Sequence, residues 1–417
     1  PRTRHHLDAL KAQPPKTPAN LERLEAFTTR TAKTSASKAI ASAEEMLRAQ
    51  RYRTQVFGDS VSAERGYLRE TGNLVFHSAL IGMLVAVGLG SGFGYTGQRV
   101  VVEGYAFNNS LASYDSFNPG RFFDASSLAP YSIALDRFDA TYEENNLKAY
   151  GQATDYTATV TSTLRGQQPQ QQTIKVNSPL EIAGDQVYLL GNGYAPVITV
   201  RDPDGHTVYS QPVPFLPQDA NLFSLGIIKV PDGLSKQIGM RGLLYPTALR
   251  LDSGTFASSH PALRDPLLTL EVFTGDLGLD NGKGTNAYAL NTDSLTEIAG
   301  RKAKSPTIAL RPGDRVDLPN GLGSVELTAI PRFVSLDVHH DPAQGWALVF
   351  AILIVSGLLT SLFVPRRRMW VRAVRSGRGT VILEYAALAR GDDPGLDAAV
   401  QDFAERRSSQ LGLKVGS

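Results

Sequence analysis

The sequence predicts an α+β membrane protein in which two transmembrane helices flank a large, sandwich-like, β-rich extracytoplasmic domain, with small α/β segments on the cytoplasmic side. Three observations support this fold class: two long uncharged segments, the uneven distribution of charge among the segments they separate, and a succession of short apolar runs in the longest of these segments. The overall composition hides these features, since the net charge of +2 over 417 residues is typical of a soluble protein.

The two uncharged segments are residues 71–98 and 342–365, which are 28 and 24 residues long. A bilayer core about 30 Å thick requires ~20 apolar residues at a rise of about 1.5 Å each, so both segments are long enough to cross it. The alternative is a pair of buried core helices, but core helices of this length normally carry a polar face. We therefore predict transmembrane helices over residues 71–97 and 342–364.

The charge distribution orients these two helices. Residues 1–70 contain 13 Lys and Arg against 8 Asp and Glu, residues 99–341 contain 19 against 26, and residues 365–417 contain 10 against 6. Because basic residues flank the cytoplasmic ends of membrane helices, both ends of the chain are predicted to be cytoplasmic. The prediction is a multi-pass plasma-membrane protein in contact with lipid, with residues 98–341 outside.

The cytoplasmic segments, residues 1–70 and 365–417, are predicted to form one small α/β domain. Capping residues, apolar spacing and turn residues predict its elements. In chain order these are a helix capped by Asn20 that carries Leu21, Leu24 and Phe27, a helix over residues 38–51, a hairpin over residues 52–67 around Gly58, strands over residues 370–374 and 380–388 joined by a turn at 376–379, and a helix begun by Asp393 and Pro394.

The external segment alternates short apolar runs with turn sequences such as Pro231-Asp232-Gly233. Regular short strands with this punctuation indicate a sandwich or a curved sheet. The predicted strands cover residues 100–105, 132–138, 156–164, 172–176, 187–190, 197–201, 208–211, 247–251, 267–273, 307–310 and 323–331. Residues 274–300, which are rich in Gly, Asn, Asp and Thr, are predicted to be a loop.

Several classes of chemistry are excluded by what the sequence lacks. With no cysteine, the chain has no disulfide, thiolate metal site, Cys nucleophile or covalent haem attachment of its own. It also lacks a Walker loop, a His-Glu-x-x-His motif and a Gly-x-Ser-x-Gly motif. Its arginine clusters lack aromatic partners for stacking on bases, so no nucleic-acid partner is predicted. A self-contained hydrolase or nucleotide enzyme is disfavoured, and no catalytic residue is assigned.

His77 is the main candidate for a functional residue, because it is the only ionisable side chain predicted to lie within the hydrocarbon. Ionisable groups inside a membrane are costly and usually functional. Imidazole is a common ligand of haem iron, and an apolar groove beside it would suit the porphyrin. The alternative is a histidine that forms a hydrogen bond across a helix pair. Sequence spacing alone leaves both readings open.

His339, His340 and Asp341 are weaker candidates, placed just outside the second predicted membrane helix. They would serve as ligands or as a proton relay, or would simply form a solvated flank. Adjacent residues on a strand point to opposite faces, so the two imidazoles are not expected to share one site. His206 is expected to be exposed in a turn, and His260 has no recognisable triad partner.

Specific stretches resemble the ResB family of system II cytochrome c biogenesis proteins. Residues 62–78 (SAERGYLRETGNLVFHS) resemble the signature before and within the third membrane helix of the family. Shorter matches, with an Ala- and Arg-rich style similar to the actinobacterial branch, are Val101-Val102-Glu103-Gly104, Val176-Asn177-Ser178-Pro179-Leu180, Asp341-Pro342 with Gly345, and Trp370. Pro1-Arg2 is similar to the sequence directly after the second family helix, so two further helices are expected upstream.

This resemblance implies a function. ResB-family proteins work with a ResC/CcsA-type membrane partner to export haem and support its attachment to the Cys-x-x-Cys-His motif of apocytochrome c. By resemblance, His77 is one axial ligand of the iron of non-covalent haem b, and the partner supplies the other. A thioredoxin-like protein would reduce the substrate cysteines. The chain would then be part of a haem lyase complex without being catalytic alone.

Two other function classes remain open from the sequence. In the first, the chain is a non-catalytic membrane scaffold whose external domain docks partner proteins without binding haem. In the second, it is a membrane-anchored hydrolase with a convergent nucleophile and base. One departure from the family also matters: many relatives have a histidine before the Arg-Arg-x-Trp sequence that follows the last helix, whereas this chain has Pro365. No histidine at that position can therefore have a role here.

Overall fold

The computed structural model describes residues 11–279, 286–377, 379–391 and 393–410. The chain forms two compact units, residues 1–88 with 343–417 and residues 89–342. The first unit thus combines both ends of the chain with the two long apolar helices, whereas the second is built from the middle of the chain. Pro1 and Arg2, which carry part of the family resemblance, lie outside the described residues.

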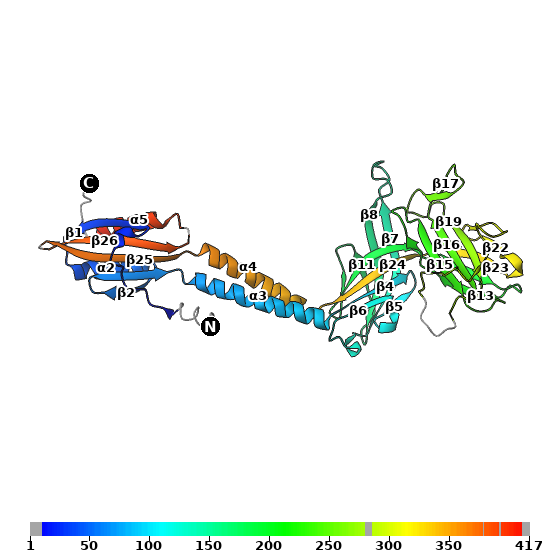
Figure 1. The fold of residues 1–417 in the computed structure, drawn as a ribbon, viewed down its shortest axis with the longest axis horizontal. Helices are drawn as coiled ribbons and strands as arrows, with labels where there is room; N and C mark the ends of the chain where they lie inside the picture. The colour runs from blue at the N-terminus through cyan, green and yellow to red at the C-terminus, as the bar shows by residue number, and fades with distance from the viewer. Residues whose placement is uncertain (1–10, 280–285, 378, 392, 411–417) are drawn as a thin grey trace. The chain divides into compact units, whose positions relative to one another are not determined.

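The first unit contains an antiparallel five-stranded sheet with two helices packed on one face (Figure 1). Its strand order is β1 (Ala26–Ala32), β26 (Thr380–Arg390), β25 (Arg366–Gly377), β3 (Ser60–Arg65) and β2 (Arg53–Phe57), and its helices are α2 (Ala36–Ala49) and α5 (Leu396–Gln410). Ile40 and Leu47 of α2 and Phe403 of α5 are buried against Leu383 and Tyr385 of the sheet. Strands from both ends of the chain therefore share one core.

Most of the predicted elements of this unit are present. Ser35 caps α2 by accepting a hydrogen bond from the backbone N–H of Lys38, and the predicted hairpin is β2 and β3. The predicted helix capped by Asn20 is wrong, because only a 3-10 turn, η1 (Leu21–Arg23), forms there and Phe27 lies in β1. The threonine-rich run after Phe27 favours extended backbone, and pairing with β26 stabilises it. The predicted turn at 376–379 includes residue 378, which lies outside the described residues.

The two uncharged segments form the long helices α3 (Leu68–Phe93) and α4 (Gln344–Phe363). Both are long and apolar enough to cross a membrane by length and composition. Helix α3 begins three residues before the predicted start and ends at Phe93, because strand β4 (Tyr95–Val102) begins directly after it. Leu84 is 74% exposed and Leu348 is 64% exposed. Such a continuous apolar surface requires apolar surroundings.

Small residues bring α3 and α4 together. A Cβ atom added to Gly72 would lie 2.8 Å from the carbonyl oxygen of Gly357, and one added to Gly357 would lie 2.7 Å from the backbone nitrogen of Phe76. Further along, Gly82 faces the ring of Phe350. Glycine thus permits direct contact between the helix backbones, as is common between helices in membranes.

The second unit contains two hydrophobic cores, each lined by two antiparallel sheets (Figure 1). Around the first core lie the sheet β10 (Leu180–Ile182), β11 (Asp185–Tyr194), β24 (Arg332–His340), β4, β6 (Ser116–Pro119) and the sheet β5 (Ala106–Asn108), β7 (Tyr131–Tyr142), β8 (Ala153–Leu164), β9 (Gln170–Lys175). Around the second lie the sheet β13 (Thr207–Pro212), β12 (Val197–Arg201), β23 (Ser324–Ala329), β22 (Arg315–Asp317) and the sheet β14 (Leu216–Pro217), β15 (Ser224–Val230), β16 (Ile238–Tyr245), β19 (Leu267–Thr274), β20 (Thr296–Ala299), with β21 (Ile308–Leu310) on β19; β17 (Ala248–Arg250) pairs β18 (Phe256–Ser258) separately.

The predicted β-rich character of this segment is confirmed, but three important strands were not predicted. Strands β15 and β16 form the middle of the largest sheet, and β24 lies between β11 and β4. Within the predicted loop of residues 274–300, β20 pairs with β19, while residues 280–285 lie outside the described residues. The strand β24 matters most for function, because it carries His339 and His340.

We predict that Gly357→Ala lowers the stability of the helix pair by about 1–3 kcal/mol, because its added methyl group has no room against α3. The measurement is the thermal unfolding midpoint of the purified protein in mild detergent. The matched control is Gly88→Ala in α3, where an added Cβ meets nothing within 4 Å. Equal midpoints for the two variants would contradict a glycine-mediated helix contact.

Candidate functional site

His77 lies in α3 and points away from α4. Five residues separate it from Gly72, which places it about 140° around the helix from the Gly72 contact. Its side chain is accordingly exposed. Exposed apolar side chains of Leu80, Ile81 and Leu84 follow it along the helix. The imidazole is therefore available to a ligand or a second chain on an otherwise apolar surface.

A local hydrogen bond fixes the tautomer of His77. Nδ1 lies 2.9 Å from the carbonyl oxygen of Asn73, one turn earlier in the same helix. Because a carbonyl only accepts, Nδ1 carries a hydrogen, and the neutral ring in this geometry has its lone pair on Nε2. The ring also meets Phe76 edge-on at a centroid distance of 5.1 Å. A metal-bound imidazole typically donates its other N–H to an oxygen in this way, so His77 has the tautomer of a metal ligand.

The predicted separation of His339 and His340 is observed, since the two side chains bind different carboxylates. Nε2 of His339 lies 2.6 Å from Oδ2 of Asp337, whereas Nδ1 of His340 lies 2.8 Å from Oδ1 of Asp185. Asp341 follows at the end of β24 and lies beside Gly90. The structure thus does not bring His339 and His340 into one site, and the role of all three residues remains a prediction.

The partner of His340 is the centre of a buried polar network. Asp185 is 1% exposed, and its Oδ2 accepts hydrogen bonds from the hydroxyls of Tyr95 at 2.6 Å and Tyr131 at 2.7 Å. The Nδ2 of Asn109 lies 3.4 Å from the same oxygen. The ring of His340 stacks on Tyr95 with an interplanar angle of 12°. Four donors therefore surround one carboxylate.

Strand register assembles this network. His340 is paired with Asp185 on β11 and with Tyr95 on β4. Burial raises the pKa of Tyr95, and its hydrogen bond to Asp185 raises it further. Burial also raises the pKa of Tyr131, with the charge of Asp185 as the next cause. Both phenols therefore remain protonated donors at neutral pH. Sequence reasoning missed Asp185, because nothing local indicates a partner 155 residues from His340.

A second ionic cluster lies in the first unit, where α3 begins and α4 ends. Arg366 is 7% exposed, and its guanidinium donates to Glu64 at 2.6 Å and to Glu70 at 2.8 Å. Arg368 also donates to Glu64, at 2.9 Å, and Arg390 donates to Glu70, at 3.2 Å. The sequence indicated only that these arginines flank a membrane helix. The structure shows that they are also bound to buried carboxylates.

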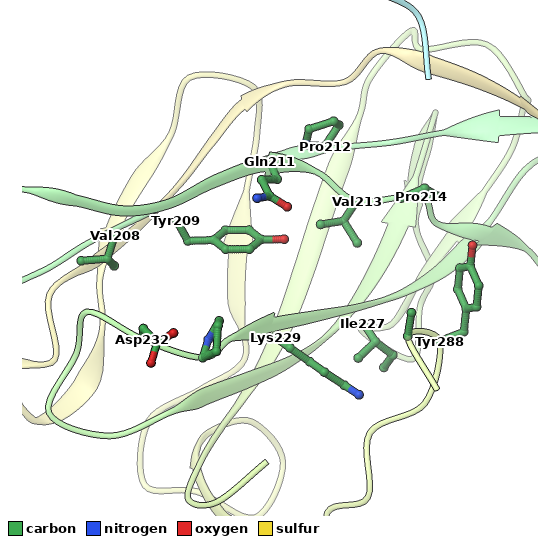
Figure 2. Close-up of a pocket in the computed structure, with 12 residues that line it drawn as sticks. Val208, Tyr209, Gln211, Pro212, Val213, Pro214, Ile227, Lys229, Asp232 and Tyr288 are labelled. Atoms are coloured by element: carbon green, nitrogen blue, oxygen red, sulfur yellow. The ribbon is translucent and has the colours of Figure 1, made fainter. Parts of the chain in front are cut away.

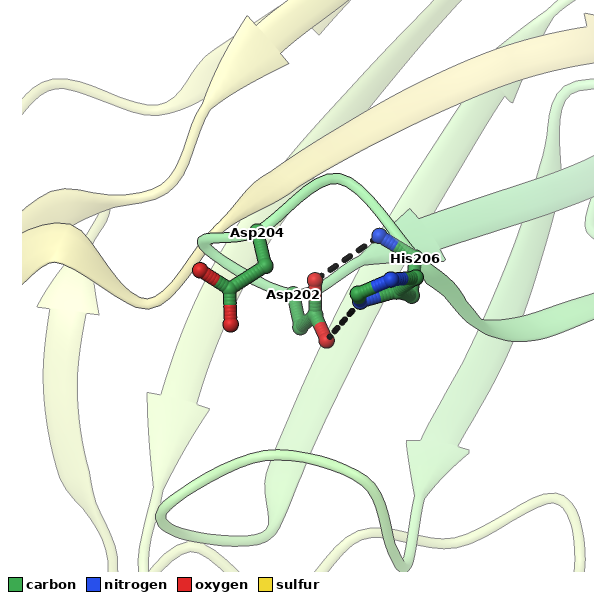
Figure 3. Close-up of side chains that lie close together, drawn as sticks. All are labelled: Asp202, Asp204 and His206. Carbon is green, nitrogen blue, oxygen red and sulfur yellow. Dashed lines mark hydrogen bonds and ion pairs between the residues drawn. The ribbon is translucent and has the colours of Figure 1, made fainter.

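Within the described residues, one group of His, Asp and Glu side chains is close enough together to hold a metal ion, namely Asp202, Asp204 and His206 (Figure 3). Asp202 accepts from both the backbone N–H and Nδ1 of His206, at 2.8 and 3.2 Å. The side chain of His206 is 79% exposed, as expected. These bonds close the turn between β12 and β13, and nothing else at this turn points to a ligand.

A groove of about 500 Å³ lies over β13 and β15 of the second unit (Figure 2). Tyr209 and Lys229 lie on its two sides, and Val213, Ile227 and Tyr288 line one end. The groove combines apolar walls with one cation, Lys229, and one carboxylate, Asp232. It is a candidate docking surface without chemistry of its own.

His260 does not form a hydrolytic site. It is 2% exposed, and its Nδ1 accepts the backbone N–H of Ala262 at 3.0 Å while Nε2 lies 3.4 Å from Arg264. Burial and the neighbouring Arg264 lower its pKa. The nearby hydroxyl of Ser258 donates to backbone carbonyls instead. Among the described residues, this histidine therefore lacks a nucleophile.

These features define a class of protein: a β-rich domain inserted between two long apolar helices, one of which presents a single outward imidazole. The chain belongs to the ResB-like family, whose model matches residues 1–401. The family resemblance of the sequence is thereby confirmed. The family is membrane-associated and is associated with cytochrome c biogenesis. A comparison with curated proteins gives no match.

We predict that Asp185→Asn lowers the free energy of unfolding by about 3 kcal/mol, because several buried donors lose a charged acceptor. Denaturant unfolding in mild detergent measures the change. Asp337→Asn is the matched control, since Asp337 faces the more exposed His339, and it should cost less than about 1 kcal/mol. A similar decrease in the free energy of unfolding in both variants would show that the Asp185 network does not stabilise the fold more than the exposed pair of Asp337 and His339.

Proposed function

We propose that the chain is the haem-handling subunit of a system II cytochrome c maturation complex. With a ResC/CcsA-type partner it carries haem b outward across the plasma membrane and presents it for attachment to the Cys-x-x-Cys-His motif of apocytochrome c. The observation that supports this most directly is His77, whose Nδ1 is held by Asn73 and whose Nε2 faces outward from an apolar helix surface. Family membership supports the same pathway.

The chemistry of His77 fits one axial position of haem iron. A neutral imidazole with its Nδ1–H bound to an oxygen is the common protein ligand for this metal. The apolar side chains around it suit a porphyrin ring, which loses unfavourable water contact when it is covered. The helices α3 and α4 contain no other histidine, so a second imidazole ligand would come from outside this helix pair, and we propose that the partner supplies it.

Both helices are proposed to cross the membrane, with the sheet of the first unit in the cytoplasm and the second unit outside. Helix α4 supports this orientation, because Trp346 is exposed at its first turn and Arg366, Arg367 and Arg368 follow its end. Aromatic residues favour the membrane interface, and basic residues mark the cytoplasmic side. The chain contributes no cysteine, so a separate thioredoxin-like protein would reduce the substrate thiols.

We predict that His77→Gly reduces the haem bound by the purified complex by about tenfold or more and removes its low-spin, bis-imidazole spectrum. Added imidazole should restore part of the spectrum, because it can occupy the vacated position. His206→Gly, at an exposed turn, is the control and should leave both unchanged. Unchanged haem in His77→Gly would favour the alternative function, a scaffold that docks partner proteins without holding haem.

Sidedness can be tested separately, since the chain has no cysteine of its own. We expect a membrane-impermeant maleimide to label Leu147→Cys, 90% exposed in the wild type, in intact cells. Ser37→Cys, at an exposed position of α2, should be labelled only after permeabilisation. The reverse pattern would contradict the proposed orientation.

A further inference from the structure

The ionic cluster of the first unit surrounds a cavity of about 290 Å³. Its walls are Glu64, Arg366, Arg368, Leu388, Ala389 and Arg390, all from strands β3, β25 and β26. This volume is at the lower bound for pockets that hold a small organic molecule. It suits a charged arm of a ligand rather than a whole porphyrin.

Among the described residues, this cluster has more guanidinium groups than buried carboxylates. Two buried carboxylates, Glu64 and Glu70, would be neutralised by two guanidinium groups, but three contact them. The side chain of Arg366 is buried, whereas the side chains of Arg368 and Arg390 are 38% and 72% exposed. Each guanidinium has five N–H donors. Among the described residues, the structure gives the side chains of Arg368 and Arg390 one hydrogen bond each, so most of their donors are available.

We propose that this cavity is a carboxylate-binding site, in which Arg368 and Arg390 bind the propionates of the haem whose iron is held by His77. The planar guanidinium group forms paired hydrogen bonds with carboxylates, which gives both affinity and orientation. Two rim arginines match the two propionate groups of one haem. This inference rests on the proposed haem-handling function and adds the residues that orient the cargo.

Helix geometry connects the cavity to His77. Glu70, which binds Arg366 and Arg390, precedes His77 by seven residues in α3. Seven residues are about two turns, which corresponds to about 10.5 Å along the axis and a rotation of only about 20°. Both residues therefore lie on the same side of α3, away from the Gly72 contact with α4. In the proposed orientation, a haem along this side has its iron at Nε2 and its propionate edge toward the start of α3, where the cavity lies.

A phosphate group would use the same donors, so an anionic lipid headgroup is the competing occupant. The two differ in what else they contact, because haem also requires His77 and a lipid does not. The experiment therefore varies the ligand as well as the protein. The ligands are haem, its dimethyl ester, in which both propionates are masked, and phosphatidylglycerol in place of phosphatidylcholine.

The full chain in phosphatidylcholine nanodiscs is titrated with haem and with the dimethyl ester, and binding is followed by the Soret band. For the wild type we expect haem to bind at least tenfold more tightly than its ester. The double variant Arg368→Gln/Arg390→Gln should lose this preference and keep the His77-dependent spectrum. The control is Arg375→Gln on β25, which removes an exposed positive charge outside the cavity and should retain the preference.

Three results would overturn the inference. If the wild type does not distinguish haem from its ester, the cavity does not bind propionates, whatever the stability of the variants. If the double variant keeps the preference, these arginines are not responsible for it. If phosphatidylglycerol abolishes the preference in the wild type, the cavity is a lipid site. If the wild type binds no haem at all, the proposed function is refuted as well. If it binds haem through His77 but binds the dimethyl ester equally well, only this inference is refuted.

Discussion

The close contact of α3 and α4 through Gly72 and Gly357 is the constraint on which the functional reading depends. Because α4 occupies the glycine side of α3, His77 on the opposite side is left exposed, whereas Glu70 on that side is buried against its arginine partners. The same contact buries little of the apolar surface of either helix, so both helices require apolar surroundings. The contact between α3 and α4 thus determines which way the imidazole of His77 points and leaves apolar side chains exposed around it.

Buried carboxylates surrounded by donors occur near both ends of the helical segments. Glu64 and Glu70 bind arginines where α3 begins and α4 ends. Asp185 binds Tyr131 on β7 and, on the strands that adjoin the other ends of α3 and α4 in sequence, Tyr95 and His340. Breaking such a buried group would leave an uncompensated charge, so each network holds its strands in one register.

Sequence patterns predicted the elements whose signal is local. The two uncharged segments form helices α3 and α4, and short apolar runs such as residues 197–201 form strands. The helix expected after Asn20 was wrong, because pairing with β26, more than 350 residues away, overrides a local capping signal. Strand β24 was not predicted, although Val334, Leu336 and Val338 alternate with polar residues, because Pro331 directly before it is typical of the end of a strand. The Asp185 network depends on register between distant strands, which no local pattern contains.

His77 and His340 both have Nδ1 committed to an oxygen, so tautomer alone does not decide which of them suits haem. Their surroundings differ. His340 is flanked by Asp185 and stacked on Tyr95, so its ring belongs to the buried polar network. His77 is held only by its own helix and stands among exposed leucine and isoleucine side chains. Since a porphyrin gains most of its binding energy from covered apolar surface, we propose His77 rather than His340 as the haem ligand. The proposed carrier function would also require release of the haem, and an imidazole held by a single local hydrogen bond can reorient more readily than one fixed by a buried network.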